Sequence, residues 1–181
     1  VVGYDLNKLH IGALGTLGVI CEVTVKVHPI PRAEALIVGR FTSQAAANAV
    51  AHSLARSNLA LRAVDVTTDL ADPPASFTTS VAVWCSGWQA AVDRQVREVA
   101  TAFSAGAASS IDTLTGDDHV ALRSRIEARR VRPAQIRFAV LPDTLGSVQY
   151  DVSRELRDAG IADATWVARA GIGIAHVGLK Q

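Results

Sequence analysis

The chain has 181 residues, of which 49% are apolar and 19% are charged. This balance is typical of a folded globular protein and excludes an intrinsically disordered one. The formal net charge is only +1, and the sequence has no apolar run of about 18 residues, the length that a membrane-spanning helix needs. We therefore expect neither a nucleic-acid partner nor a membrane span.

Two glycine-containing segments open the chain, Gly3-Tyr4-Asp5-Leu6 and, after a short spacer, Gly12-Ala13-Leu14-Gly15-Thr16-Leu17-Gly18-Val19-Ile20. Glycine permits positive φ and close approach of the backbone, and successive unpaired N–H groups can hold an anion or a cofactor. Apolar and polar residues then alternate, which predicts a strand from Val19 to Pro29. Because the glycines precede a strand and not a helix, the pattern argues against a Rossmann fingerprint. A tight turn that feeds a strand is the alternative interpretation.

The next part of the chain begins at a stiff joint, Pro29-Ile30-Pro31, which predicts a domain boundary. The pattern beyond it predicts three strands, over residues 34–41, 60–67 and 79–86, with a turn region over residues 69–76. A helix is predicted from residue 42 or 43 to about 57, ended by Asn58. A second helix is predicted from an apolar stripe formed by Trp88, Val92, Val96, Val99 and Phe103.

Further elements follow a break at residues 106–110. The pattern predicts a helix over 117–130 and then a strand, a helix and two strands, over residues 136–141, 144–160, 164–170 and 174–179. The order β-α-β followed by a strand thus occurs twice. This internal symmetry predicts an α+β fold with a ferredoxin-like layer, one mainly antiparallel sheet with helices on one face.

The opening segments together resemble one superfamily, the FAD-linked oxidases of the vanillyl-alcohol oxidase and para-cresol methylhydroxylase (PCMH) type. The usual pattern there is GYDL, a spacer, GSxGTLGVI, a glutamate and a strand that ends at a proline. In this sequence the glutamate is Glu22, the proline is Pro29, and Ala13 replaces the usual serine. Leu14 replaces the glutamate of the larger 2-hydroxy-acid dehydrogenases, which makes the segment more similar to the smaller FAD-binding subunit of glycolate oxidase.

The resemblance implies that residues 1–29 are the C-terminal end of a PCMH-type FAD-binding domain and residues 30–181 a ferredoxin-like cap, or substrate, domain. It implies FAD contacts from Gly12, Leu14, Gly15, Thr16, Leu17, Gly18, Val19 and Ile20. The family carries a further N-terminal subdomain that wraps the FAD pyrophosphate. Because this chain begins inside the motif without a methionine, we expect it to be the C-terminal part of a longer protein.

Arginines are concentrated in one ten-residue stretch, which contains Arg123, Arg125, Arg129, Arg130 and Arg132. The simplest interpretation is a solvated helix face. The alternative is that one arginine binds a carboxylate substrate through a bidentate fork, and the candidates are Arg123 and, in a strand of the cap sheet, Arg137.

Metal and redox-active residues are sparse. His176 ends a segment that resembles a degenerate HAGDGNLH motif, whose histidines help to hold a metal in the larger 2-hydroxy-acid dehydrogenases. Here Arg169, Ile172 and Ile174 replace the first histidine, the aspartate and the asparagine, so we expect no metal and a structural role for His176. The other histidines form no triad or metal spacing: His10, His28, His52 and His119. Cys21 and Cys85 are expected to be buried free thiols.

Two hypotheses about function follow. The first is part of an FAD-dependent oxidoreductase that oxidises a small 2-hydroxy acid such as glycolate or lactate. The second is a non-catalytic FAD-binding or assembly subunit, in which the ferredoxin-like layer is an interaction module of a multi-subunit dehydrogenase. The expected partners are a small carboxylate substrate and other dehydrogenase subunits, and the expected location is the cytoplasm, with peripheral attachment to a membrane through such subunits as a further option.

Overall fold

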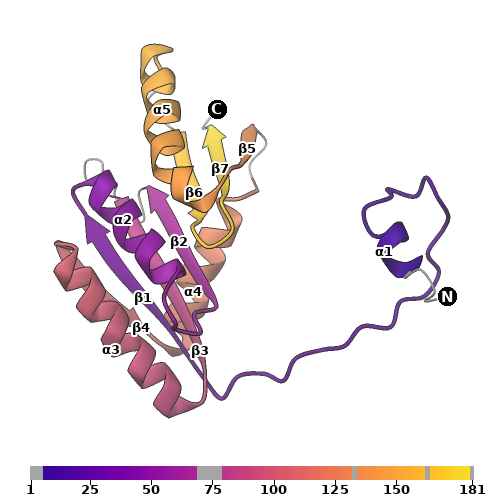
Figure 1. Ribbon diagram of the computed structural model, residues 1–181, viewed down its shortest axis with the longest axis horizontal. Coiled ribbons are helices and arrows are strands. Elements are labelled where there is room, and N and C mark those ends of the chain that lie inside the picture. Colours follow the sequence, from indigo (N-terminus) through magenta and orange to yellow (C-terminus); the bar gives the residue numbers. More distant parts are fainter. Residues whose placement is uncertain (1–5, 69–78, 132–133, 162–163, 180–181) are drawn as a thin grey trace. The chain divides into compact units, whose positions relative to one another are not determined.

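The computed structural model describes residues 6–68, 79–131, 134–161 and 164–179, and the chain divides into two units, Val1–Ile30 and Pro31–Gln181. Three predicted features fall outside the described residues: Gly3-Tyr4-Asp5, the turn region 69–76 and Arg132. In the first unit the spacer forms a short helix, α1 (Leu6–His10), followed by turns and an extended segment (Figure 1). The sequence pattern did not predict α1.

The described strands of the second unit form one seven-stranded sheet (Figure 1). Their bounds are β1 (Ala33–Phe41), β2 (Ala63–Thr68), β3 (Thr79–Gly87), β4 (Ser110–Leu114), β5 (Gln135–Ala139), β6 (Ala164–Arg169) and β7 (Ile174–Leu179). The strand order is β4-β1-β3-β2-β6-β7-β5, and every neighbouring pair is antiparallel. The antiparallel α+β architecture predicted from the sequence is therefore confirmed.

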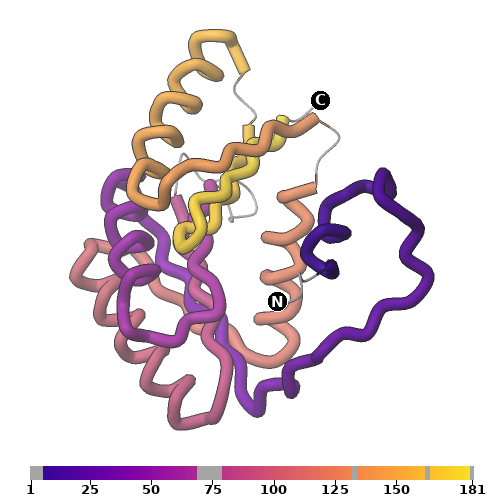
Figure 2. The backbone as a smooth tube through the Cα atoms, turned by 45° about the vertical axis from the view of Figure 1, so that its right-hand side comes forward, coloured from indigo at the N-terminus to yellow at the C-terminus, as the bar shows by residue number. Residues whose placement is uncertain are grey.

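Four helices of about three turns or more and one short 3₁₀ turn pack on this sheet. Their bounds are α2 (Gln44–Ala55), α3 (Gln89–Ala105), α4 (Gly116–Ala128), η1 (Pro142–Thr144) and α5 (Leu145–Asp158). Residues of α2, α3 and α5 share a core with one face of the sheet, as predicted, whereas α4 packs through Ile126 and Leu122 against the other face. Figure 2 shows α4 on the side of the sheet opposite to α2 and α3.

The predicted internal symmetry is visible in the strand order. The segments β1-α2-β2-β3 and β5-α5-β6-β7 each place their third strand between the first two, and β2 pairs with β6 where the two repeats meet. In the first repeat, α3 and β4 complete a β-α-β-β-α-β unit with the order β4-β1-β3-β2, which is the ferredoxin-like arrangement.

Several local predictions need correction. Residues 19–29 are extended but form no strand in the described part of the chain, because alternation predicts a strand face but a ladder also needs a partner strand. β4 was missed because it is short and has no apolar run. The helix α2 ends at Ala55 with Arg56 as its C-cap, so Asn58 does not end it. Trp88 lies outside the buried stripe, since it is the N-cap of α3 and is 66% exposed.

No helix within the described ranges combines the length and the hydropathy that crossing a bilayer requires.

The tightest packing between the sheet and α3 is predicted to tolerate no added methyl group. A Cβ built on Gly39 of β1 would lie 2.7 Å from Phe103 Cδ2, and Phe103 is fully buried against Phe41 at a ring-centroid distance of 5.8 Å. We expect Gly39→Ala to lower the free energy of unfolding by about 1–3 kcal/mol in urea denaturation, because overpacking a dense core forces side chains from their rotamers.

The matched control is Gly171→Ala, whose added Cβ would meet only Ala55 Cβ at an ordinary 3.9 Å. The control should have nearly wild-type stability. Equal stability of the two variants would contradict this account of the core.

Candidate functional site

The glycine segment of the first unit contains two residues whose conformation requires glycine. Gly12 and Gly15 have φ values of +83° and +79°, and a Cβ on either would meet nothing within 4 Å. Between them Leu14 also has a positive φ of 51° and is 95% exposed. Thr16 closes the turn, since its N–H and its hydroxyl both donate to the carbonyl of Ala13, at 2.9 and 2.7 Å.

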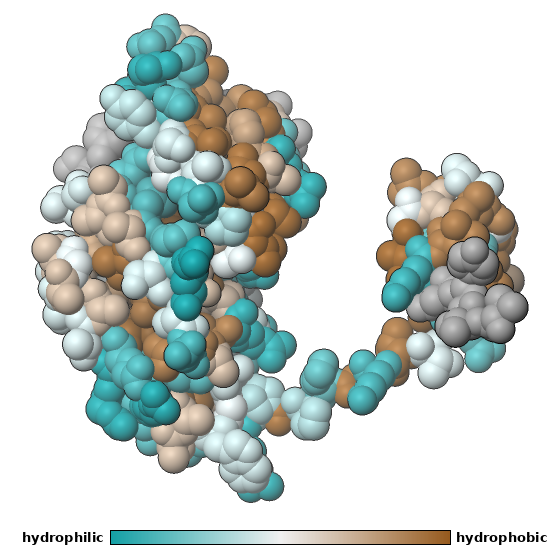
Figure 3. Space-filling view, in the orientation of Figure 1, coloured by the Kyte–Doolittle hydropathy of each residue, from teal (hydrophilic) through white to brown (hydrophobic). Residues whose placement is uncertain are grey.

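The backbone beyond this turn offers donors. Within residues 6–30, the N–H groups from Leu17 to Ile20 donate to no carbonyl. Large apolar side chains are exposed along this segment, including Val19 at 89% and Val27 at 79%. Figure 3 shows hydrophobic residues at the surface of the first unit. Open space over two glycines, N–H groups without an acceptor in the described residues and exposed apolar side chains are compatible with the predicted flavin contacts.

Charged side chains gather on the face of the second unit's sheet that α4 partly covers. Asp65 of β2 is 7% exposed and accepts hydrogen bonds from Arg130 at 2.8 Å and from Arg169 at 3.2 Å. Glu127 of α4 pairs with the same two guanidinium groups, at 2.9 and 3.2 Å. Burial alone would lower the pKa of the Arg169 guanidinium. The hydrogen bonds and the negative charges of Asp65 and Glu127 outweigh burial, so the net effect raises this pKa.

Arg137 and His176 lie on the same face beside this network. They are Cα partners across β5 and β7, and His176 is in turn paired with Val167, which packs on the α4 side. Arg137 is exposed, and no hydrogen bond or ion pair of its side chain occurs with any described residue. Burial, with the positive charges of Arg130 and Arg137, lowers the pKa of His176 from its ordinary 6.5, and Glu127 offsets part of this shift.

The two predicted substrate-binding arginines do not lie together. Arg123 of α4 stacks on the ring of Trp84 in β3, with its Cζ 4.5 Å from the ring centroid, and Arg62 stacks on the same ring at 4.6 Å. Four strand steps separate β3 from β5, so Trp84 and Arg137 are about 19 Å apart across the sheet. A single small carboxylate cannot reach both Arg123 and Arg137.

The arginine-rich stretch is not a solvated helix face. Arg130 is paired and its side chain is only 14% exposed, Arg129 donates to the Thr68 carbonyl at 2.9 Å, and Arg123 is stacked. The sequence analysis missed Asp65, the carboxylate that organises these arginines. A lone acidic residue inside the apolar run of β2 was the available signal, because a buried carboxylate needs a cationic partner.

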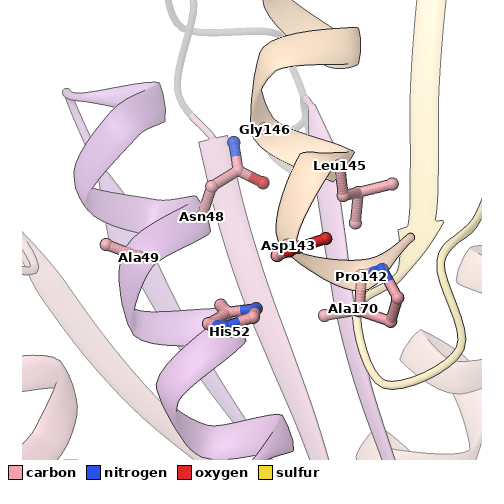
Figure 4. A pocket seen from close by; sticks show the side chains of 8 residues that line it. All are labelled: Asn48, Ala49, His52, Pro142, Asp143, Leu145, Gly146 and Ala170. Carbon is pink, nitrogen blue, oxygen red and sulfur yellow. The ribbon is translucent and has the colours of Figure 1, made fainter. Parts of the chain in front are cut away.

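A cavity of about 200 Å³ lies on the opposite face, between α2 and the start of α5 (Figure 4). Its polar lining consists of Asn48, His52 and Asp143. Asn48 also donates to Gln149 at 2.8 Å, which ties α2 to α5. None of the sequence-predicted site residues lines this cavity.

The remaining candidates for chemistry are metal ligands and the two cysteines. The described residues contain no group of three or more His, Cys, Asp or Glu side chains that could hold a metal ion. Cys85 is buried, and burial raises its pKa to about 12, so it is an inert thiol. Cys21 is exposed, contrary to the prediction, because the extended segment around it has no covering partner among the described residues.

Two known proteins share sequence with this chain. It is 42% identical over 64 residues to D-lactate dehydrogenase [cytochrome] 1, mitochondrial, of Saccharomyces cerevisiae. The matched segment is 35% of this chain and 11% of that protein. It is 41% identical over 51 residues to glycolate oxidase subunit GlcE of Escherichia coli. Here the matched segment is 28% of this chain and 15% of that protein. Lactate and glycolate are both 2-hydroxy acids. These relatives confirm the resemblance inferred from the opening motif.

Solved structures confirm the fold. Two crystal forms of alkyldihydroxyacetonephosphate synthase match with TM-scores of 0.73 and 0.71, at 15% and 17% identity. The matches cover 100% and 98% of this chain but only 43% and 40% of those chains. At such low identity the likeness concerns architecture alone. No protein-family model matches the chain.

Asp65 is predicted to be essential for stability. In Asp65→Asn the guanidinium groups of Arg130 and Arg169 lose the buried carboxylate that they share and keep only the more exposed Glu127. We expect the free energy of unfolding in urea to fall by about 3 kcal/mol, the lower end of the cost of breaking a buried ion pair, because Glu127 still neutralises part of the charge. The control is Glu98→Gln, which breaks the exposed Arg94–Glu98 pair and should change stability very little. An equally small loss in Asp65→Asn would contradict the assignment.

His176 is predicted to make stability depend on pH. Its pKa is lower in the folded chain than its ordinary 6.5, so the unfolded chain takes up the proton first. The contribution of the neutral imidazole is complete above pH 6.5 and is lost as pH falls from there toward the lower folded-state value. The stability difference between the wild type and His176→Gln, measured by urea denaturation, should therefore change across this window. A difference that is independent of pH would contradict the lowered pKa.

Proposed function

We propose that this chain is part of an FAD-dependent oxidoreductase that oxidises a small 2-hydroxy acid of the glycolate or lactate type. The observation that carries the proposal is its similarity to a D-lactate dehydrogenase and to a glycolate oxidase subunit. The matched segments are short parts of both relatives, so the activity, substrate and partners of the whole protein all belong to the proposal.

The cofactor-binding part is the first unit. We assign residues 1–29 to the end of the FAD-binding domain and residues 30–181 to the cap. The unpaired N–H groups from Leu17 to Ile20, the open space over Gly12 and Gly15, and the exposed Leu14 and Val19 support contacts with FAD. When bound, FAD supplies the hydride acceptor, and the chain supplies backbone donors and an apolar surface that orient it.

The substrate-binding part is the open end of the charged sheet face. Arg137 is the arginine best suited to a carboxylate, because it is exposed and unpaired in the described part of the chain, beside a network whose other guanidinium groups are occupied. Arg123 is less suited, since its guanidinium stacks on Trp84. A planar guanidinium can bind both carboxylate oxygens at once.

A non-catalytic role is the second candidate, and the naming of one relative as a subunit favours it. In that case the protein binds FAD and assembles with other dehydrogenase subunits without oxidising substrate itself. A cytoplasmic location, with peripheral membrane attachment through such subunits, belongs to the same proposal.

Flavin absorbance tests both candidates. Purified full-length protein that contains this chain should show the visible flavin bands, and anaerobic addition of glycolate or D-lactate should bleach them if the protein is catalytic alone. Bleaching only after a partner subunit is added would favour the second candidate. A full-length protein without flavin would refute both.

Arg137 provides the mutational test. Arg137→Ala should weaken binding of glycolate to the flavin-loaded protein by about 10- to 100-fold, because a hydrogen bond to a charged group contributes about 1.5–3 kcal/mol. The matched control is Arg157→Ala on α5, which lies on the opposite face of the sheet. Arg157 is also exposed, and its side chain forms no hydrogen bond or ion pair with any described residue. Titration of the flavin spectrum measures both affinities, and equal affinities would remove Arg137 from the site.

A further inference from the structure

We propose that the cavity between α2 and the start of α5 binds a small zwitterion, an α-amino acid with an aliphatic side chain. Only side chains of the second unit take part and no flavin is involved, so this site is independent of the proposed function. The size of the cavity, its two unpaired charges, its polar wall and its apolar lining support the assignment.

The cavity has two connected parts. The part shown in Figure 4 has a volume of about 200 Å³, and a second part of about 290 Å³ continues it toward the end of α2. The two parts share four lining residues, His52, Pro142, Asp143 and Ala170. Pockets for drug-sized ligands have volumes of about 300–1,000 Å³, so each part suits a molecule much smaller than a flavin or a nucleotide.

Two opposite charges line the cavity without meeting. Asp143 lines both parts, and Arg56, the C-cap of α2, lines the second. Both side chains are exposed, and neither forms an ion pair with the other or with any other described residue. A ligand that carries an ammonium group and a carboxylate group can pair with both of them at once, through charge-assisted hydrogen bonds.

A polar wall is contributed by α2. Asn48 and His52 are one helical turn apart, and Figure 4 shows both side chains extending from α2 toward the start of α5. Asn48 Nδ2 donates to a backbone carbonyl of the preceding turn at 3.0 Å and to Gln149 Oε1 at 2.8 Å, so both amide hydrogens are engaged. The Asn48 oxygen remains as an acceptor for an ammonium group. The His52 ring has no partner among the described residues and can donate to a carboxylate beside Arg56.

The apolar lining comes from both sides of the sheet's last connections. Leu145 and Ala170 line the cavity and are buried, and Pro142 adds a further apolar surface. Covering these atoms removes apolar area from water, which favours a ligand with a short aliphatic side chain.

Other small ligands fit the charges less well. A divalent cation needs several oxygen or imidazole ligands, whereas the described residues of this cavity supply one carboxylate and one imidazole, with the guanidinium of Arg56 nearby. A simple anion would be repelled by Asp143, and a simple cation by Arg56. A zwitterion leaves neither charge without a partner.

The first experiment is a calorimetric titration of the full-length protein that contains this chain with L-alanine, L-valine and L-leucine. We expect one saturable site per chain for at least one of them. The N-acetyl and carboxamide derivatives of that amino acid each lack one charge and should bind about 10- to 100-fold more weakly, since a hydrogen bond to a charged group is lost.

The second experiment changes the protein. Asp143→Asn and Arg56→Gln should each weaken binding of the same amino acid by about 10- to 100-fold. Both residues are exposed, so the variants should fold as the wild type does. The matched control is Asp158→Asn, which removes another exposed carboxylate at the far end of α5 and should leave the affinity unchanged. Because the ligand binds the folded chain, it should also raise the Tm of the wild type and the control more than that of the two variants.

The outcomes are decisive in either direction. The absence of a saturable site for all three amino acids would overturn the proposal. Wild-type affinity in Asp143→Asn or in Arg56→Gln would show that the amino acid binds elsewhere, and equal affinity for the two derivatives would refute a zwitterionic ligand. None of these results requires flavin, so a failure here would leave the proposed function standing.

Discussion

The interaction on which the second unit depends is the ion-pair network around Asp65. The two repeats of the sheet meet along β2 and β6, where the ladder contains only the pairs Asp65–Arg169, Val66–Ala168 and Thr67–Val167. On one face, Asp65 joins Arg169 of the second repeat to Arg130 at the end of α4. On the other face, Asn48 and Gln149 join α2 to α5. Polar contacts on both faces of the sheet thus stabilise the short β2–β6 ladder between the repeats.

Such polar contacts serve specificity more than raw stability. A buried ion pair gains little net free energy over apolar side chains, because both charges must be desolvated, but an unpaired buried charge is costly. A register shift of one residue between β2 and β6 would turn Asp65 away from Arg169. The network therefore favours one alignment of two repeats that are each built from similar apolar strands.

The sequence predicted the repeats well because their signals are local. The apolar stripe of Val92, Val99 and Phe103 and the alternation in the strands depend on neighbours within a few residues, and these side chains are buried as expected. The same kind of signal was misleading at residues 19–29, where alternation was present but no described strand pairs with it. A local pattern can predict a face, but a ladder depends on a partner that is distant in sequence.

The candidate site was less predictable for the same reason. The number of arginines between residues 123 and 130 was evident from the sequence. Which of them is paired or stacked depends on distant residues: Asp65 pairs with Arg130 from 65 residues earlier in the chain, and Trp84 stacks on Arg123. Arg137 stands apart because its side chain has no hydrogen bond, ion pair or ring contact with any described residue, which the sequence could not reveal. Its partner across the ladder, His176, is likewise identified by strand order and not by spacing.

Arg130 connects the ion-pair network to the β5–β7 end of the charged face. This guanidinium is held by Asp65 and Glu127, and its charge in turn lowers the pKa of His176. The residues that fix the β2–β6 seam therefore also set the electrostatic potential at the β5–β7 end of the sheet. Glu127, which is engaged by Arg130 and Arg169, offsets only part of this shift. The stability of the seam and the protonation of His176 thus depend on the same pairing of charges.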